Sequence, residues 1–255
     1  MVRWLLNHVS SPVLLLIIVG AALAIGAAAE WWQAHQRGRP TRANDMVTLT
    51  VEFVGLAYAI MVGFVIVNLW QDQTDAREAV SQEASALRDI ATLSEVLPAD
   101  SARIAAAVRT YCDVVVNDEW PLLRNGTRSE RGHDAADGVL RAITAVDASD
   151  PLADKLQSSM IDSFKEFTGL RTHRVALADV QLARELWLLV ILASVSLILL
   201  VAAFESEGSK WHIGATMVVA ATIGTILFVV VALSYPFSGD VSVSPSPFIE
   251  LARSL

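Results

Sequence analysis

Long uncharged stretches alternate with charged segments along this 255-residue sequence. Four intervals contain 19 or more consecutive residues without a formal charge, at 4–29, 53–71, 186–204 and 211–239. A helix needs roughly 20 apolar residues to cross the hydrocarbon core of a bilayer. The pattern therefore predicts four transmembrane helices, at about residues 12–29, 47–70, 186–204 and 213–235.

Aromatic residues mark the ends of these predicted spans. They are Trp31, Trp32, Trp70, Trp187, Trp211 and Tyr235. Such amphipathic rings prefer the headgroup level of a membrane. Because the segments inside each pair of spans are short, we expect an all-α integral membrane protein with two transmembrane hairpins. The first hairpin would occupy residues 1–70 and the second residues 186–235, on either side of a helical domain at 71–185.

The polar segment between the hairpins has the periodicity of helices. Apolar residues recur every three or four positions from Ala76 to Val96, so the second span is expected to continue as one long helix that ends before Pro98. Three further helices are predicted to follow it, from Asp100 to a stop at Pro121, over about 134–146, and from Pro151 toward the third span. The sequence contains no strand pattern of any length.

The segment after the fourth span is rich in proline and serine. Its three prolines and one glycine argue against a continuous helix. We therefore expect an extended C-terminal tail at 236–255, in which Ser246 and Pro247 could begin a short terminal helix.

The distribution of basic residues predicts the orientation in the membrane. With four spans, both termini and the 71–185 domain share one side. That side carries seven arginines near the membrane: Arg3, Arg77, Arg88, Arg171, Arg174, Arg184 and Arg253. The other side carries Arg37, Arg39, Arg42 and Lys210. Since cytoplasmic segments carry the excess of Lys and Arg, the termini and the domain are predicted to be cytoplasmic.

Composition excludes several classes of protein. The sequence is 54% hydrophobic and 18% charged, whereas an ordinary soluble domain is about 25% charged. Residues 71–185 include 20 acidic and 13 basic residues, which argues against nucleic acid as a partner. The single cysteine, Cys112, cannot form a disulfide within the chain. The first span could be a signal peptide cleaved near Ala27–Ala29, but its long apolar run favours an uncleaved span.

No established catalytic or cofactor-binding pattern is present in the sequence. The five histidines form no HxxxH or HExxH pair, and no nucleophile elbow, phosphate loop or dinucleotide loop appears. His133, Asp134 and Asp137 could gather a cation, but acidic residues at a helix start also suit the helix dipole. We therefore expect neither an enzyme, a metal site nor a cofactor.

One face of the second span combines an acidic residue with small residues. At 100° per residue, this face holds Thr48, Glu52, Gly55, Ala59, Gly63, Ile66 and Trp70. Small residues at four-residue spacing let helices approach closely, and an acidic side chain within a span avoids lipid. In one interpretation the face is a helix contact and Glu52 reaches the headgroups. In the other, copies of this helix surround a pore lined by Thr48, Glu52, Gly55, Ala59, Gly63 and Ile66.

Two short motifs lie outside the spans. The first begins with Tyr111 and ends in the run Asp118, Glu119, Trp120 and Pro121. It could be a helix end that packs against its neighbours, or the rim of a ligand pocket. The second is the run Pro236, Phe237, Ser238 and Gly239, directly after the fourth span.

Together with Glu83, Arg171, Arg174 and Trp187, these motifs resemble a bacterial membrane family called bestrophin-like. The resemblance covers about residues 45–250 and implies a distant relation to bestrophin ion channels. It implies a four-span homo-oligomer in the bacterial inner membrane, with inorganic ions as permeants. No acidic calcium-binding clasp can be matched, so calcium gating is not implied.

The sequence and the resemblance together predict an oligomeric ion channel in the lipid bilayer. The second span would line its pore, with an undetermined ion selectivity. The alternative is a membrane-anchored signalling or scaffold module that acts through a partner protein, because a span that continues into a cytoplasmic helix can transmit motion.

Overall fold

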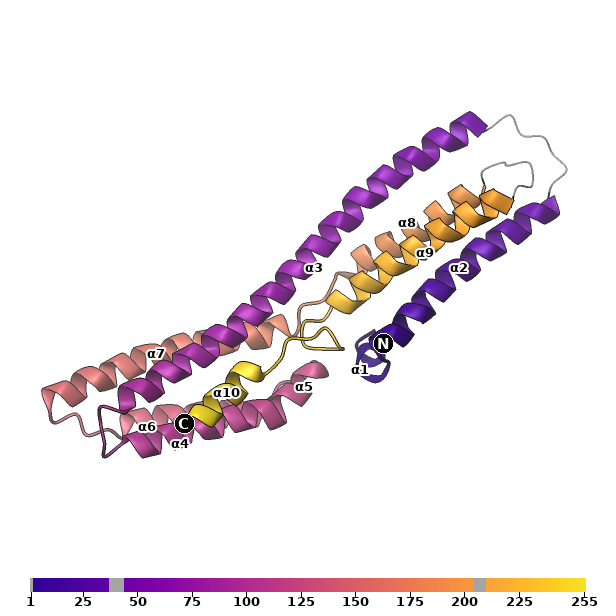
Figure 1. The fold of residues 1–255 in the computed structure, drawn as a ribbon. Helices are drawn as coiled ribbons and strands as arrows, with labels where there is room; N and C mark the ends of the chain where they lie inside the picture. The colour runs from indigo at the N-terminus through magenta and orange to yellow at the C-terminus, as the bar shows by residue number, and fades with distance from the viewer. Residues whose placement is uncertain (1, 37–43, 204–209) are drawn as a thin grey trace. The chain divides into compact units, whose positions relative to one another are not determined.

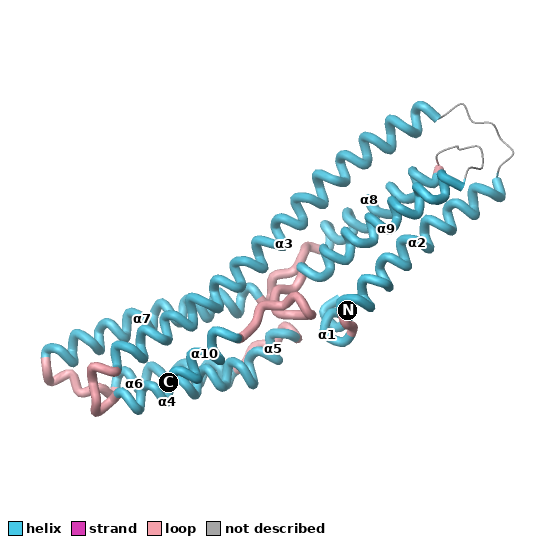
Figure 2. The backbone as a smooth tube through the Cα atoms, viewed as in Figure 1, coloured by secondary structure: helices cyan, strands magenta, loops and turns pink. Residues whose placement is uncertain are grey.

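The computed structural model describes residues 2–36, 44–203 and 210–255. Within these ranges the chain is helical apart from short connections, and no strand is present there (Figure 2). The chain divides into two compact units. The first unit comprises Met1–Gln71 and Gln181–Ser234, and the second unit comprises Asp72–Val180 and Tyr235–Leu255.

The first unit contains the membrane-spanning candidates (Figure 1). Four helices in the described part of the chain are long and apolar enough to cross a membrane, which confirms the predicted fold class. They are α2 (Ser11–Gln36), α3 (Asn44–Ser94), α8 (Arg184–Ala202) and α9 (Lys210–Leu233), and a short α1 (Val2–His8) precedes them. The predicted end of the third span at Phe204, and Arg37, Arg39 and Arg42, lie outside the described residues.

The helix α3 confirms the prediction that the second span continues without a break. It is 51 residues long, and its residues after Gln71 belong to the second unit. In the first unit, its buried side chains Tyr58 and Val62 pack with α8 and α9. The Tyr58 hydroxyl also lies 3.1 Å from the Ser194 hydroxyl on α8. One face of α3 therefore belongs to the core of the first unit.

The second unit is a bundle around one apolar core. Its helices are the last part of α3, α4 (Ser101–Val114), η1 (Val115–Glu119), α5 (Trp120–Arg124), α6 (Glu130–Thr144), α7 (Pro151–Leu177) and α10 (Ser246–Ser254). Buried residues from each of these helices form a single cluster. Asp150 caps α7 by accepting hydrogen bonds from the Leu152 and Ala153 backbone N–H groups.

Two predicted helix boundaries differ from the structure. The helix expected over about 134–146 is α6, which begins earlier, at Glu130, because Ser129 caps it. The helix expected to stop at Pro121 continues to Arg124, because η1 is π-helical: the Trp120 N–H bonds the Val115 carbonyl five residues back. This wider turn accommodates a proline, which has no N–H to donate, at the start of α5. The C-terminal segment forms turns and extended chain up to Pro245, and then α10 begins at Ser246, the position at which a short terminal helix was expected; burial of one apolar face stabilises this helix.

Candidate functional site

The predicted pore-lining face of α3 is the face that its own chain leaves largely uncovered. Glu52, Ala59 and Gly63 are exposed, while Thr48, Gly55 and Ile66 are partly buried. A Cβ atom added at Gly63 would meet no atom within 4 Å, and one at Gly55 would meet only a Leu197 methyl group at 3.9 Å. Larger apolar side chains beside this face are also exposed: Leu49, Phe53, Leu56, Ile60, Phe64 and Val67. The part of this face at Glu52, Ala59 and Gly63 is therefore open in a single chain, whereas Ile66 packs against the core of the first unit.

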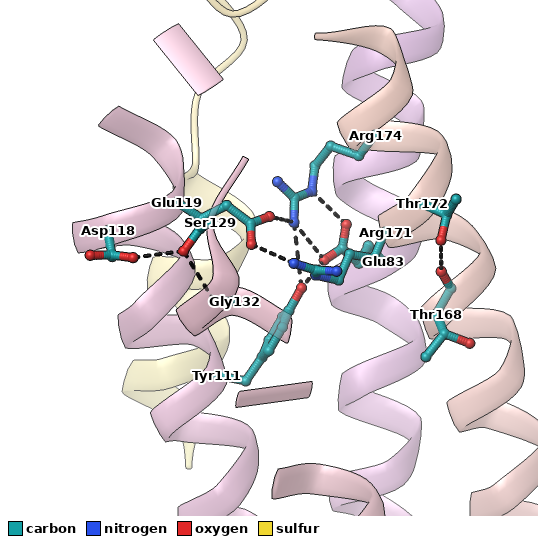
Figure 3. Close-up of polar contacts among 10 residues, drawn as sticks. All are labelled: Glu83, Tyr111, Asp118, Glu119, Ser129, Gly132, Thr168, Arg171, Thr172 and Arg174. Carbon is teal, nitrogen blue, oxygen red and sulfur yellow. Dashed lines mark hydrogen bonds and ion pairs between the residues drawn. The ribbon is translucent and has the colours of Figure 1, made fainter. Parts of the chain in front are cut away.

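The first motif outside the spans is part of a buried network of charges in the second unit (Figure 3). Its centre is Arg174 on α7, which has no exposed surface. The Arg174 Nε donates to Glu83 Oε2 at 2.6 Å, and Nη2 donates to Glu83 Oε1 at 3.1 Å and to Glu119 Oε1 at 2.7 Å. Arg171 Nη2 donates to the other oxygen of Glu119 at 2.8 Å. Two carboxylates and two guanidinium groups therefore balance one another inside the unit.

Aromatic side chains complete the surroundings of this network. The Tyr111 hydroxyl donates to Glu83 Oε1 at 2.5 Å. The guanidinium carbon of Arg174 lies 5.6 Å from the ring centroids of both Trp120 and Phe248, within the range of cation–π attraction. The network thus joins α3, α4, η1 and α7, and α10 covers it through Phe248.

Arg174 and Tyr111 keep their ionisation states over a wide pH range. Burial alone lowers the pKa of the Arg174 guanidinium, but Glu83, Tyr111 and Glu119 raise it well above its usual value. Burial raises the pKa of the Tyr111 hydroxyl well above its usual value, and the Glu83 carboxylate raises it further. Arg174 therefore stays charged and Tyr111 stays a neutral donor at physiological pH.

Asp118, next to Glu119, holds the start of α6 in place. One of its carboxylate oxygens accepts a hydrogen bond from the Ser129 hydroxyl at 2.7 Å, and the other accepts one from Arg131 at 3.0 Å. Ser129 in turn caps α6 by accepting a hydrogen bond from the Gly132 N–H at 3.1 Å. The π-helical turn of η1 therefore presents Asp118 to α6 and Glu119 to the buried network.

Gly132 is required where α6 approaches Glu119. A Cβ atom at this position would overlap Glu119 Oε2 and lie 2.9 Å from Arg171 Nη2. We expect Gly132→Ala to displace Glu119 and to lower the free energy of unfolding by about 1–3 kcal/mol, as overpacking does. Thermal unfolding of the purified protein measures this loss.

Gly138→Ala on the same helix is the matched control. Its added Cβ meets only Arg141 Nη2, at 3.8 Å. Alanine is the better helix former by roughly 0.8–1.0 kcal/mol, so this variant is expected to be as stable as wild type or more stable. Equal losses in the two variants would contradict the close contact between Gly132 and Glu119.

The two predicted motifs outside the spans meet in the structure. Phe237 packs against Trp120, with ring centroids 5.5 Å apart and planes at 80°, and the Ser238 hydroxyl donates to the Arg124 carbonyl at 2.8 Å. Gly239 has a φ of 83°, a left-handed conformation that glycine adopts without steric cost. The Val243 N–H donates a hydrogen bond of 2.8 Å to the Pro236 carbonyl, which closes this turn.

The sequence pattern did not identify Glu83 and Arg174 as paired site residues. The sequence does contain a signal for this buried pair. Glu83 lies seven positions after Ala76, and Arg174 lies seven positions after Phe167. Positions seven apart share a helix face to within about 20°, so both charges fall on faces that are otherwise apolar. A charge on each of two buried faces predicts a buried pair, although it does not identify which charges meet.

Cys112 lies beside Tyr111 and is fully buried. Burial, reinforced by Asp113 and Glu83, raises the pKa of its thiol to about 12. Because the thiolate is the reactive species, we expect no alkylation of the folded protein by a maleimide at pH 8, and complete labelling in denaturant. Mass spectrometry measures both, and since Cys112 is the only cysteine, rapid labelling of folded protein would contradict this burial.

In the described ranges, no group of three or more His, Cys, Asp and Glu side chains could hold a metal ion. His133 lies 3.9 Å from Asp137 on the exposed side of α6, and these two residues form a pair, not a group of three ligands. The buried network has each carboxylate bonded to more than one donor. Its geometry suits the joining of helices.

Comparison with known proteins relates the whole chain to one family. A family model described as the bestrophin-like domain matches residues 15–248. No curated protein is similar to the chain at a significant level.

Several solved structures share the fold. A point variant of a bacterial bestrophin homologue from Klebsiella pneumoniae superposes with a TM-score of 0.73 at 14% identity, over 94% of this chain and 98% of that chain. The structure of the Klebsiella pneumoniae homologue solved by zinc phasing gives a TM-score of 0.72 at 14% identity, covering 93% and 96% of the two chains. With the family model matching most of its length, this chain belongs to the bestrophin-like family.

Proposed function

We propose that this protein is a homo-oligomeric ion channel in which copies of α3 surround the ion path. Membership in the bestrophin-like family, together with the fold shared with bestrophin homologues, supports a channel-type membrane protein and not an enzyme. The observation that carries the proposal is the face of α3 on which an exposed carboxylate, Glu52, is followed by the exposed small residues Ala59 and Gly63.

The chemistry of this face suits an axial pore. Glu52 lies near the start of α3, and Gly55, Ala59 and Gly63 follow it. A carboxylate in a span is costly in lipid and is normally found facing a bundle interior or water. Around an axis, copies of Glu52 would form a charged ring, and the small residues would let the helices approach below it. We infer that Thr48 and Ile66 mark the two ends of this pore-lining stretch.

The proposed orientation has both termini and the second unit in the cytoplasm of a bacterial inner membrane. It rests on the excess of arginines on that side of the predicted spans. The domain at 71–185, which carries more acidic than basic residues, would then border the cytoplasmic end of the ion path. That charge favours cations near the mouth, and the ion selectivity itself is left to measurement.

A second function is favoured by one specific feature, the continuity of α3. This single helix extends from the apolar segment of the first unit to Glu83 and Ile90 in the core of the second. A continuous helix of this kind can transmit motion to a partner protein, as in a signalling or scaffold module. The absence of conductance from a folded, oligomeric protein in a bilayer would favour this function.

The assembly is tested by the mass of the protein in detergent and by Gly63→Leu. We expect the wild type to purify as a ring-forming oligomer, and the variant to shift toward smaller assemblies, because a leucine at the proposed helix contact separates the helices. Light scattering coupled to size exclusion measures the mass. In the variant, we expect more than half of the protein to leave the oligomer peak and appear in smaller assemblies.

Gly20→Leu in α2 is the matched control. A Cβ at either glycine meets nothing within 4 Å in the isolated chain, so neither change clashes within one subunit. Only Gly63 lies on the proposed contact face. An unchanged assembly in Gly63→Leu, or an equal loss in both variants, would contradict the placement of α3 at the subunit contact.

A further inference from the structure

A cavity of about 610 Å³ lies in the second unit, between the start of α6 and the later turns of α7. Cavities of this size accommodate small organic molecules. Its lining includes the charged and polar side chains Arg128, Glu130, His133, Asp134, Arg171 and Thr172. The cavity is separate from the uncovered face of α3, and the proposed ion path does not use it.

The two sides of the cavity carry opposite charges. Glu130 and Asp134 lie one turn apart on α6 and are exposed. Among the residues that the structure describes, neither side chain forms an ion pair or a hydrogen bond. Arg171 lines the α7 side, and Arg128, which pairs with Asp179 at 3.2 Å, lies at the edge. Two exposed carboxylates therefore face one space with two guanidinium groups that are already paired elsewhere, Arg171 with Glu119 and Arg128 with Asp179.

Arg171 retains donor capacity toward the cavity. Its Nη2 is bonded to Glu119 and its Nε is buried without an acceptor in the described part of the chain, so Nη1 is the group left to donate toward the cavity. The side chain remains 15% exposed. A guanidinium offers five N–H donors in a planar fork that matches a carboxylate. Arg171 can therefore take a second carboxylate in addition to Glu119.

We propose that this cavity binds a small zwitterion that carries one carboxylate and one ammonium group. The ligand carboxylate would bind Arg171, and the ammonium group would lie between Glu130 and Asp134. A simple anion would meet the two acidic side chains, and a simple cation would meet the two arginines, so a ligand with both charges is the complementary one. Through Arg171, the bound carboxylate would share a guanidinium with Glu119 and so affect the buried network. Binding itself does not depend on ion conduction.

Calorimetry on the purified full-length protein tests this with probes of defined charge. The zwitterions are glycine, β-alanine, 5-aminopentanoate and 6-aminohexanoate, whose charge separation increases with length. Pentanoate and pentylammonium are the singly charged counterparts. We expect at least one zwitterion to bind about tenfold more tightly than either counterpart, a difference that one charge-assisted contact supplies.

The double variant Glu130→Gln with Asp134→Asn locates the binding. Both side chains are exposed, so the thermal unfolding temperature should match wild type. We expect zwitterion affinity to fall about tenfold while pentanoate binding stays the same. Glu166→Gln, an exposed position on α7 outside the cavity, should change neither. No heat from any zwitterion, equal binding of pentanoate, or full affinity in the double variant would each overturn the proposal.

Discussion

Replacing Arg174 with methionine is expected to lower the free energy of unfolding by about 3–5 kcal/mol, the cost of leaving buried charge without its partner. Methionine keeps much of the side-chain length and the contact with Trp120 and Phe248. It removes every donor that Glu83 receives from α7 and one of the two that Glu119 receives. We expect a large fall in the unfolding temperature and in the yield of folded protein.

Arg131→Met is the matched control for this prediction. Arg131 also forms an ion pair with a carboxylate of η1, Asp118 at 3.0 Å, but its side chain is 73% exposed. Solvent screens such a pair, so its loss should cost no more than about 1 kcal/mol. Arg174→Met with Glu83→Gln should recover part of the lost stability, because Glu119 and Arg171 then remain as one balanced ion pair. A stable single variant would contradict the buried network.

The helical architecture could be predicted from the sequence because its signals are local. Charge-free intervals of sufficient length identify membrane-spanning helices in any fold. The period of three to four residues continues from the second span past Ala76 to Val96, and a single helix results. Asp150 followed by Pro151 similarly marks the start of α7.

The boundaries that were wrong depend on non-local packing. Pro121 is tolerated because the π-helical turn before it changes the register of the backbone. This turn also buries Glu119 and Trp120, whose partners lie on α7 and in the C-terminal segment. The start of α10 at Ser246 was expected from the sequence, but the burial of Phe248 and Leu251 in the core of the second unit was not. Neither partner is near in sequence, so no local pattern identifies these contacts.

The candidate site was predictable in part. The residues Glu119, Trp120, Phe237 and Ser238 were singled out as unusual runs, but their mutual contacts follow only from the fold. Glu83 and Arg174 fall at buried helical positions, and a pairing between them needs knowledge of which helices touch. The face of α3 around Glu52 was selected by periodicity, and in the described chain Glu52, Ala59 and Gly63 on this face are exposed.

Ion selectivity of the Glu52 variants is expected to show the largest functional effect. If the Glu52 side chains form a ring at a pore mouth, they concentrate cations and repel anions. Glu52→Gln keeps the shape and removes one charge per subunit, and Glu52→Lys reverses the local field. The cation-to-anion permeability ratio should fall by a factor on the order of three at each step, since a surface potential of a few kT is lost. Glu166→Gln should leave the ratio unchanged.

The decisive measurement is the reversal potential of reconstituted protein in planar bilayers under a salt gradient, at low and at high ionic strength. The screening length falls from about 30 Å at 0.01 M salt to about 3 Å at 1 M salt. We therefore predict that wild type conducts, that the permeability ratio falls from Glu to Gln to Lys at position 52, and that the differences shrink at high salt. Conduction with the same ratio in all three proteins would contradict an ion path lined by α3.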